Sequence, residues 1–424
     1  MSSKLAESSL HRQVGQRQSL SKGIILLMAI ACGMTVANLY YNQPLLADIG
    51  RTFQVNANQI GIISMLTQIG YAVGLFLFVP LGDMRERRQL LCILLIAVSV
   101  SLVGIATAQS LIWISIASLL VGVTTVIPQM MVPLAAQLAA PSERGKVIGT
   151  VMSGLLIGIL LARTVSGIVG GALGWRTMFG IAAVMMLLLA VILRVYLPKS
   201  YPESKISYRQ LMLSIGQLII EHRTLREASL IAAMMFGSFS AFWTTLVFYI
   251  EGAPYNYGSE IAGLFGLIGV AGALAAPIAG RLSDRYNTKY IVGCSIVITL
   301  LAFVFFWLFG NHLWGLVIGV LLLDLGVQGG QIANQSRIYS LAPEARGRLN
   351  TVYMVSTFLF GAVGSALGSY AWSLWHWNGV SAVGGSMVLI AFTVWGWHRM
   401  KERKSSYNSR NNGLDATVHR EGGA

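Results

Sequence analysis

The chain has 424 residues, of which 55% are hydrophobic and 11% are charged, and its formal net charge is +14. A soluble domain carries about 25% charged residues, whereas apolar runs of about 20 residues, enough to cross roughly 30 Å of hydrocarbon, recur along this chain. The composition excludes a soluble enzyme, a nucleic-acid-binding protein and a secreted disulfide scaffold. Cys32, Cys92 and Cys294 each lie in an apolar run, with neither zinc-ligand nor disulfide spacing.

In chain order, the apolar runs predict twelve membrane-spanning helices. They are expected at 23–46, 59–81, 89–108, 112–136, 147–172, 177–197, 228–250, 260–282, 290–310, 313–340, 351–372 and 378–397. The first run is too long for the apolar part of a signal peptide, so we expect it to stay in the membrane. The predicted organisation is a tail (1–22), a six-helix bundle (23–197), a polar linker (198–227), a second six-helix bundle (228–397) and a second tail (398–424).

The distribution of basic residues predicts the orientation of these helices. If the N-terminus is cytoplasmic, 26 of the 30 lysines and arginines fall in cytoplasmic segments, whereas the outer loops hold only Arg51 and Arg176. Such a bias is typical of multi-pass membrane proteins, whose basic residues stay inside. We therefore expect both termini in the cytoplasm, and the net positive charge needs no nucleic-acid partner.

The two halves of the sequence repeat each other at a constant spacing. Asp83 matches Asp284 at an offset of 201 residues, and Gln129 matches Gln331 at an offset of 202. Two bundles in the same orientation, with a binding site near the middle of the membrane, are the layout of many secondary transporters. The predicted fold is therefore an all-α membrane protein with twelve helices in two six-helix repeats.

Matching loops follow the second and eighth predicted helices, at 80–88 and 280–289. They resemble the G-x-x-x-D-R-x-G-R-R/K loop of the major facilitator superfamily. Matching residues are Asp83, Arg87 and Arg88 in the first copy and Gly280, Asp284, Arg285 and Lys289 in the second; Val79, Met84, Glu86, Asn287 and Thr288 depart from the pattern. The resemblance covers the whole chain and implies the twelve-helix transporter fold. The acids and arginines are expected to gate the cytoplasmic side, although the basic residues also fit the orientation rule alone.

Two charged residues lie deep in predicted helices, where a buried charge is costly and is usually paired or functional. At about 1.5 Å per residue, Arg163 lies about 24 Å from the inner face and Asp324 about 16 Å from the outer face. Pairing or a shared cavity is possible at these depths. Asp324 is the leading candidate for carrying a proton. Asp48 and Glu251, near the outer ends of the first and seventh helices, are weaker candidates for this role, and we expect them instead to be exposed acids at helix ends.

Polar side chains concentrate on the predicted first, fourth, seventh and tenth helices, which line the central cavity in the superfamily. Such groups can bind a polar solute, and aromatic rings can stack on a ring or a cation; some amides are instead expected to join helices. The predicted cavity residues are Asn38, Tyr41, Asn42, Gln43, Gln129, Trp243, Gln331, Asn334 and Gln335.

The predicted fifth helix resembles the antiporter motif g-x-x-x-G-P-x-x-G-G through Gly158 and Gly167, with Arg163 in place of the proline. The arginine that proton-linked members often carry near Ser118 is also absent. The resemblance to the twelve-helix drug:proton antiporter branch therefore carries two departures. In addition, Gly70/Gly74, Gly154/Gly158 and Gly364/Gly368 form small-residue pairs that let helices approach closely.

The expected function is secondary transport by alternating access, with proton-coupled export of a small organic solute or drug. The alternative is a facilitator or a proton-coupled importer of a polar metabolite such as a sugar. We expect no enzyme activity, because no catalytic motif is present, and no cofactor or metal. The expected partners are the solute, protons and the lipid bilayer. The protein is expected to be a monomer in the cytoplasmic (inner) membrane.

Overall fold

The computed structural model of this chain describes residues 21–421 except 83, 141, 202–207, 274–286 and 343–344; for 270–273 and 402–421 it describes the backbone alone. Asp83, Asp284 and Arg285 of the predicted gating loops therefore lie outside the described residues.

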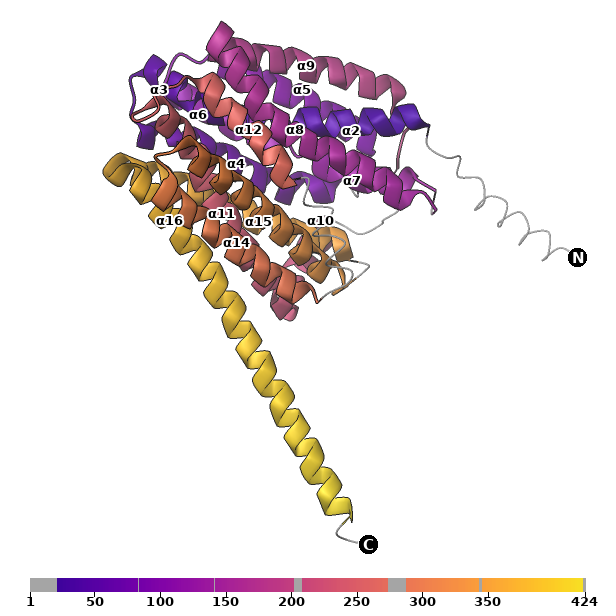
Figure 1. Ribbon diagram of the computed structural model, residues 1–424. Helices are drawn as coiled ribbons and strands as arrows, with labels where there is room; N and C mark the ends of the chain where they lie inside the picture. The colour runs from indigo at the N-terminus through magenta and orange to yellow at the C-terminus, as the bar shows by residue number, and fades with distance from the viewer. Residues whose placement is uncertain are drawn as a thin grey trace, which may run out of the picture.

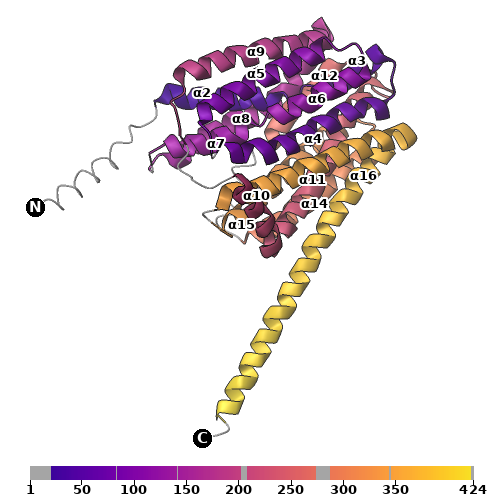
Figure 2. The same ribbon diagram turned by 180° about the vertical axis from the view of Figure 1, so that it is seen from behind.

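The described elements are all helical, and they form two bundles that lie side by side (Figures 1 and 2). The first half contains α2 (Lys22–Ala37), the 3₁₀ helix η1 (Gln43–Leu45), α3 (Leu46–Phe53), α4 (Ala57–Leu81), α5 (Arg87–Ala106), α6 (Leu111–Thr124), α7 (Ile127–Leu138), α8 (Arg144–Leu173) and α9 (Trp175–Tyr196). The connecting segment contains α10 (Tyr208–Glu221). The second half contains α11 (Arg223–Glu251), α12 (Ser259–Ala273), α14 (Thr288–Phe309), α15 (Leu313–Tyr339) and α16 (Arg346–Glu421).

These helices confirm the predicted fold class. Among the described residues, nine stretches are long and apolar enough to cross a membrane when α6 and α7 count as one, and α16 contains two crossings because it turns back at His376. The shorter apolar helices Lys22–Ala37 and Ser259–Gly269 complete the twelve. The turn lets Met387 reach Gly237 and Trp395 reach Gly293. Beyond the last crossing, the predicted tail is helical to Glu421.

The first predicted helix, 23–46, is wrong as a single element. α2 ends at Ala37, and irregular turns lead into η1 and then α3. Pro44 lies in the first turn of η1, where its missing N–H group costs no hydrogen bond. Because of the break, the polar side chains within 38–43 do not lie along one face of a regular helix.

The fourth predicted helix, 112–136, is also interrupted. α6 ends at Thr124 and α7 begins at Ile127, with Thr125 and Val126 between them. Pro128 explains the break, because proline lacks the N–H group and its ring clashes with the carbonyl four residues earlier, here that of Thr124.

Small residues set the closest helix contacts, as their spacing predicts. Gly154 and Gly158 of α8 lie against Ala29 and Gly33 of α2, and a Cβ atom added to Gly158 would overlap the Gly33 backbone. Gly364 and Gly368 pack in the same way on α11.

Replacing Gly158 with Ala is therefore expected to destabilise the fold, by roughly 1–3 kcal/mol for an overpacked contact. Gly149 in the same helix is the matched control, since a Cβ atom there meets nothing within 4 Å. Thermal unfolding of the purified protein in detergent should show a lower midpoint for G158A and an unchanged or higher one for G149A. Equal midpoints for the two variants would contradict the close α2–α8 packing.

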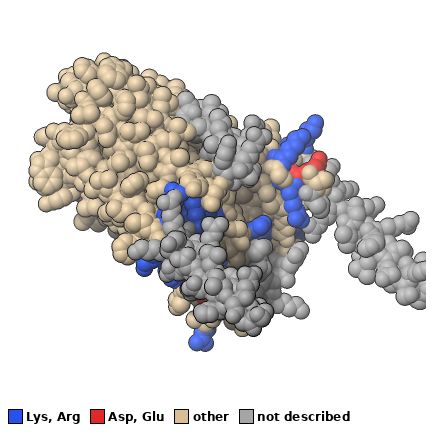
Figure 3. All heavy atoms as spheres, turned by 60° about the horizontal axis from the view of Figure 1, so that its bottom comes forward, with Lys and Arg blue, Asp and Glu red and all other residues tan. Residues whose placement is uncertain are grey.

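The contacts between the two halves differ between the two ends of the molecule. We call the end that carries α10 and the starts of α5 and α8 the linker end, and the end that carries α3 the far end (Figure 1). Toward the far end, Gly61 of α4 packs on Ser369 of α16, and Thr164 of α8 donates to the carbonyl oxygen of Gly263 in α12 (3.0 Å). At the linker end, a pocket separates the halves. Lys and Arg side chains gather at the linker end of the face in Figure 3.

Candidate functional site

Arg163 lies in the centre of the molecule, where α8 meets the irregular segment after α2. Its side chain is among the largest that are fully buried. The Nε atom donates a hydrogen bond to Oε1 of Gln43 (2.6 Å). The guanidinium carbon lies 3.9 Å from the ring centroid of Trp243 and 4.8 Å from that of Tyr40. Ring faces stabilise a desolvated cation by about 2 kcal/mol, so the aromatic side chains offset part of the cost of burying this charge.

The two terminal nitrogens of the guanidinium group have no hydrogen-bond partner among the described residues. Nη1 and Nη2 of Arg163 are buried and make no hydrogen bond there, and the same holds for Nε1 of Trp243. Buried polar groups in native proteins are nearly always hydrogen-bonded. Three unpartnered donors in one place therefore mark this region as a site and not as ordinary core. A small cavity lined by Gln43, Arg163 and Trp243 lies beside them.

Asp324 of α15 is the acidic counterpart in the second half. It is 1% exposed, and its Oδ2 atom makes no hydrogen bond within the described part of the chain. It faces Gly269 of α12, next to Leu160 of α8. Arg163 lies against Gly266 and Asp324 against Gly269 of the same helix, α12, yet the two residues are absent from the ion pairs formed within 4.0 Å among the described residues. The structure therefore shows no direct ion pair between Arg163 and Asp324.

The predicted cavity residues fall into separate groups. Gln43 and Trp243 contact Arg163 directly. Asn38 donates to the sulfur of Met186 and Asn42 donates to Thr67, so both join helices within the first half. Tyr41 is buried in the same irregular segment.

The remaining predicted residues lie nearer the linker end. Gln129 of α7 accepts a hydrogen bond from Asn350 of α16 (3.3 Å), and Gln335 donates to the same Asn350 (3.5 Å). Asn334 accepts from Arg337, and Gln331 lines a small cavity inside the second half. The structure therefore does not bring all nine residues to one place: two surround Arg163, and two meet at a bridge between the halves.

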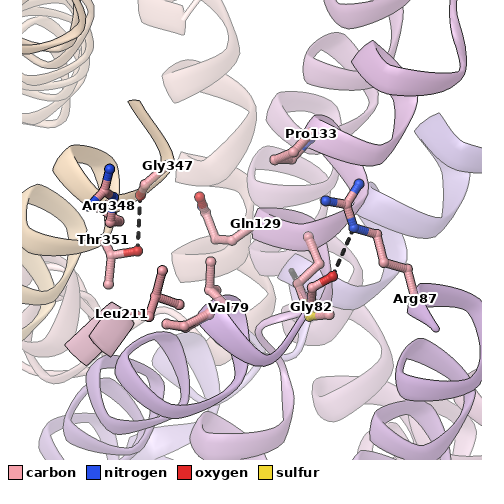
Figure 4. Close-up of a pocket in the computed structure, with 11 residues that line it drawn as sticks. Val79, Gly82, Arg87, Gln129, Pro133, Leu211, Gly347, Arg348 and Thr351 are labelled. Atoms are coloured by element: carbon pink, nitrogen blue, oxygen red, sulfur yellow. Dashed lines mark hydrogen bonds between the residues drawn. The ribbon is translucent and has the colours of Figure 1, made fainter. Parts of the chain in front are cut away.

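One residue of this bridge, Gln129, also lines the pocket at the linker end. The pocket has a cavity volume of about 70 Å³ and is lined by both halves and by Leu211 of α10. Figure 4 shows Gln129 between the two halves, with Arg87 on one side and Arg348 on the other.

The described residues of the predicted gating loops make hydrogen bonds within their own halves. The Nε atom of Arg87 donates to the carbonyl of Gly82 (2.9 Å), and its Nη1 donates to Gln137 at the end of α7. Arg88 donates to the carbonyl of Leu197 after α9 (3.1 Å). Trp395 of α16 donates to the carbonyl of Lys289 (2.9 Å). These contacts tie each loop to the ends of neighbouring helices.

At the far end, the prediction of exposed acids is wrong. Asp48 is 23% exposed and Glu251 is 10% exposed, and both form ion pairs with Arg51. Arg51 belongs to α3 and Glu251 ends α11, so this triad links the two halves. The hydrogen bond with Glu251 raises the pKa of Arg51 above its ordinary value. The sequence showed Arg51 only as an outer-loop charge, because its partner lies 200 residues away.

Replacing Arg51 with Gln is expected to loosen the far end. The Arg51 side chain is 63% exposed, and an exposed pair stabilises by at most about 1 kcal/mol, which is roughly a five-fold change in an equilibrium. A reporter cysteine at Ser369, in a background without native cysteines, should react several-fold faster with a maleimide in R51Q. R176Q, at the same end, is the control. Equal reaction rates in both variants would show that the Arg51 triad does not hold the far end closed.

The sequence analysis did not predict a second ion pair, between Glu227 and Arg337. Glu227 was assigned to the linker, but α11 begins at Arg223 and buries it. Its Oε1 atom accepts a hydrogen bond from Arg337 of α15 (2.9 Å), and both side chains are at most 7% exposed. Gln68 was also missed: it donates to Ser365 (2.7 Å) and accepts from Ser240 (3.1 Å), which joins α4 to the second half.

Comparisons with known proteins agree with this architecture. The family model of the Major Facilitator Superfamily matches residues 25–274 and 228–418. The uncharacterized transporter YgaY of Escherichia coli O157:H7 is 42% identical over 384 residues, which cover 90% of this chain and 98% of that protein. The probable transporter SCO4007 of Streptomyces coelicolor is 31% identical, with 87% and 86% covered. A probable sugar efflux transporter of Helicobacter acinonychis is 23% identical, with 82% and 88% covered.

Among solved structures, a bacterial homologue of the human lysosomal transporter Spinster, in an inward-facing and occupied conformation, is similar. Its TM-score is 0.71 at 14% identity, and 90% of this chain and 96% of that chain are covered. At this identity the likeness shows the fold alone. The family model, however, matches both halves of the sequence, and the helices supply the crossings that the fold requires. The chain therefore belongs to the Major Facilitator Superfamily and is a multi-pass membrane transporter.

Proposed function

We propose that this transporter is proton-coupled, works by alternating access and has its proton carrier at Asp324. The proposal rests on two buried charged side chains that form no ion pair and lie in opposite halves, Arg163 on α8 and Asp324 on α15. A carboxylate without partners is expensive to bury, so Asp324 is stable there when it holds a proton. Movement of the halves would change the surroundings of both charges together.

The unequal contact between the halves supports alternating access. The Arg51 triad and the Gln68 contacts close the far end, and the pocket lies at the linker end. Opening the triad and closing the pocket would expose the central site to the other side. Since basic residues gather at the linker end, we place that end, with both termini, in the cytoplasm of a bacterial cell, and the protein in the inner membrane.

The direction of transport has two candidates. Export of a small organic solute in exchange for protons is favoured by the motif likeness in α8 and by the similarity to a probable sugar efflux transporter. Import together with protons is favoured by Arg163, which replaces the proline of that motif with a fixed positive charge in the central site. The domain organisation, the monomeric state and the gating role of the loops are parts of the same proposal.

Proteoliposomes that contain a pH-sensitive dye test the proposal and separate the two directions. With no imposed pH gradient, a panel of sugars, amino acids, organic acids and drugs is added outside. Inward movement of the solute should raise the internal pH if protons are exchanged, and lower it if protons travel along. D324N and protein-free vesicles should show neither change. A compound that exchanges with its labelled form but moves no protons would contradict proton coupling.

A further inference from the structure

We propose that the central site binds a small organic anion, whose carboxylate group accepts hydrogen bonds from Nη1 and Nη2 of Arg163. That this anion is the transported solute rests on the proposed function; the binding itself rests on the geometry of the site. The inference therefore names the chemical class of the solute, as distinct from neutral sugars and cationic drugs.

Among the described residues, the contacts of the guanidinium group leave Nη1 and Nη2, which form one edge of it, without a hydrogen bond. Gln43 takes the Nε hydrogen, and the rings of Trp243 and Tyr40 lie within 4.8 Å of the guanidinium carbon. The two terminal nitrogens are buried and unpartnered among the described residues. Parallel N–H groups on a planar fork match the two oxygens of a carboxylate. A neutral hydroxyl or amide group would leave the buried positive charge uncompensated.

The surroundings suit the rest of such a molecule. Nε1 of Trp243, whose ring centroid lies 3.9 Å from the guanidinium carbon, is also unpartnered among the described residues and offers a further donor. The adjoining cavity is otherwise lined by apolar side chains, including Leu246, Val247 and Ala262. Phe239, whose ring centroid lies 5.5 Å from the guanidinium carbon, adds an aromatic surface. These donors and apolar walls match the chemistry of an anion with a small apolar body, which the cavity, about 10 Å³ in this state, would admit only when the surrounding helices move apart.

Asp324 explains why the anion site is available at all. If Asp324 were ionised, its carboxylate would be the natural partner for Arg163; when it is protonated, the arginine keeps a free charge. Asp324 lies against Gly269 and Arg163 against Gly266 of the same helix, α12, and the phenol ring of Tyr40 lies beside Arg163. An arriving anion adds negative charge near Asp324 and so favours its protonated form. Anion and proton therefore bind together, which favours import over exchange.

The test uses probes that share one body and differ in charge: phenylacetate, phenylacetamide and phenethylamine, and likewise butyrate, butyramide and butylamine. Thermal unfolding of the purified full-length protein in detergent is measured against the concentration of each probe. We expect a carboxylate to raise the unfolding midpoint in the wild type, and the matched amide and amine to leave it unchanged. Stabilisation by the amine or amide to the same extent, or by none of the probes, would overturn the proposal.

Variants of the site sharpen the result. R163Q should lose the effect of the carboxylate, and R163K should keep a weaker one, because lysine offers a point charge without the fork. W243F keeps an aromatic ring but lacks the donor, and should weaken carboxylate binding roughly ten-fold, as expected for a hydrogen bond to a charged group. If R163Q binds the carboxylate as tightly as the wild type, the assignment is refuted. If R163Q does not fold, unweakened carboxylate binding by W243F would refute it.

Failure of this inference is distinguishable from failure of the proposed function. Carboxylates that bind at Arg163 but move no protons in proteoliposomes would refute proton coupling and leave the anion site standing. Neutral or cationic solutes that drive pH changes, without any carboxylate binding, would refute the anion site and support the proposed proton coupling.

Discussion

Replacing Asp324 with Asn is expected to abolish proton-coupled transport while the protein stays folded and continues to bind its solute. Asn has nearly the same shape as a protonated Asp but cannot release a proton. In proteoliposomes, D324N should therefore exchange labelled for unlabelled solute, yet should neither accumulate solute in response to a pH gradient nor change the internal pH. The buried, unpartnered position of Asp324 makes this the largest functional effect that we expect.

Two control variants separate this effect from general damage. D324E keeps a carboxyl group and should retain part of the coupling. E143Q removes an exposed acid at the start of α8 and should behave like the wild type. Wild-type coupling in D324N would contradict the assignment of the proton carrier, and loss of exchange as well as coupling would indicate a structural role.

Replacing Arg337 with Met is expected to cause the largest loss of stability. The substitution leaves Glu227 buried without its cation, and breaking a buried ion pair in this way costs about 3–5 kcal/mol. The double variant E227M/R337M should recover most of the loss, because exchanging both partners for apolar residues is often neutral. Unfolding midpoints of the single and double variants in detergent measure this difference.

The result also tests the boundary of the second half. If Glu227 lay in a solvated linker, R337M would have little effect and the double variant would show no rescue. A double variant as unstable as R337M alone would point instead to the bond between Arg337 and Asn334 (3.2 Å), which both variants lose.

Much of the fold could be predicted because the membrane imposes a simple requirement. Each crossing needs about 20 apolar residues, so the runs and their repeat identified twelve helices and two halves. The errors fall where a proline interrupts a run without ending it. Pro44 and Pro128 break the first and fourth helices inside stretches that are apolar enough to continue. Hydropathy alone does not report such breaks, although the prolines themselves could have marked them.

The site was predicted in its charges but not in its contacts. Arg163 and Asp324 stand out because charged residues are rare inside apolar runs. Gln43 and Trp243 were among the predicted cavity residues, but their direct contact with Arg163 depends on how distant helices pack. Arg51 and Glu227 were missed for a related reason. Both lie near helix ends, where charges are common, and the partners that join them to another helix, Glu251 and Arg337, lie more than 100 residues away in the sequence.

The most direct test of the account is the exchange of protons with the medium when the solute binds. Purified protein in weakly buffered detergent solution is titrated with phenylacetate, or with the anion that gives the largest signal in proteoliposomes, and the pH is recorded. Over a series of starting pH values, the wild type should take up protons where Asp324 has lost its proton before the anion arrives, and D324N should take up none at any pH. Binding without a pH change in the wild type across the series, or equal uptake by D324N, would contradict the claim that Arg163 and Asp324 form one proton-coupled site.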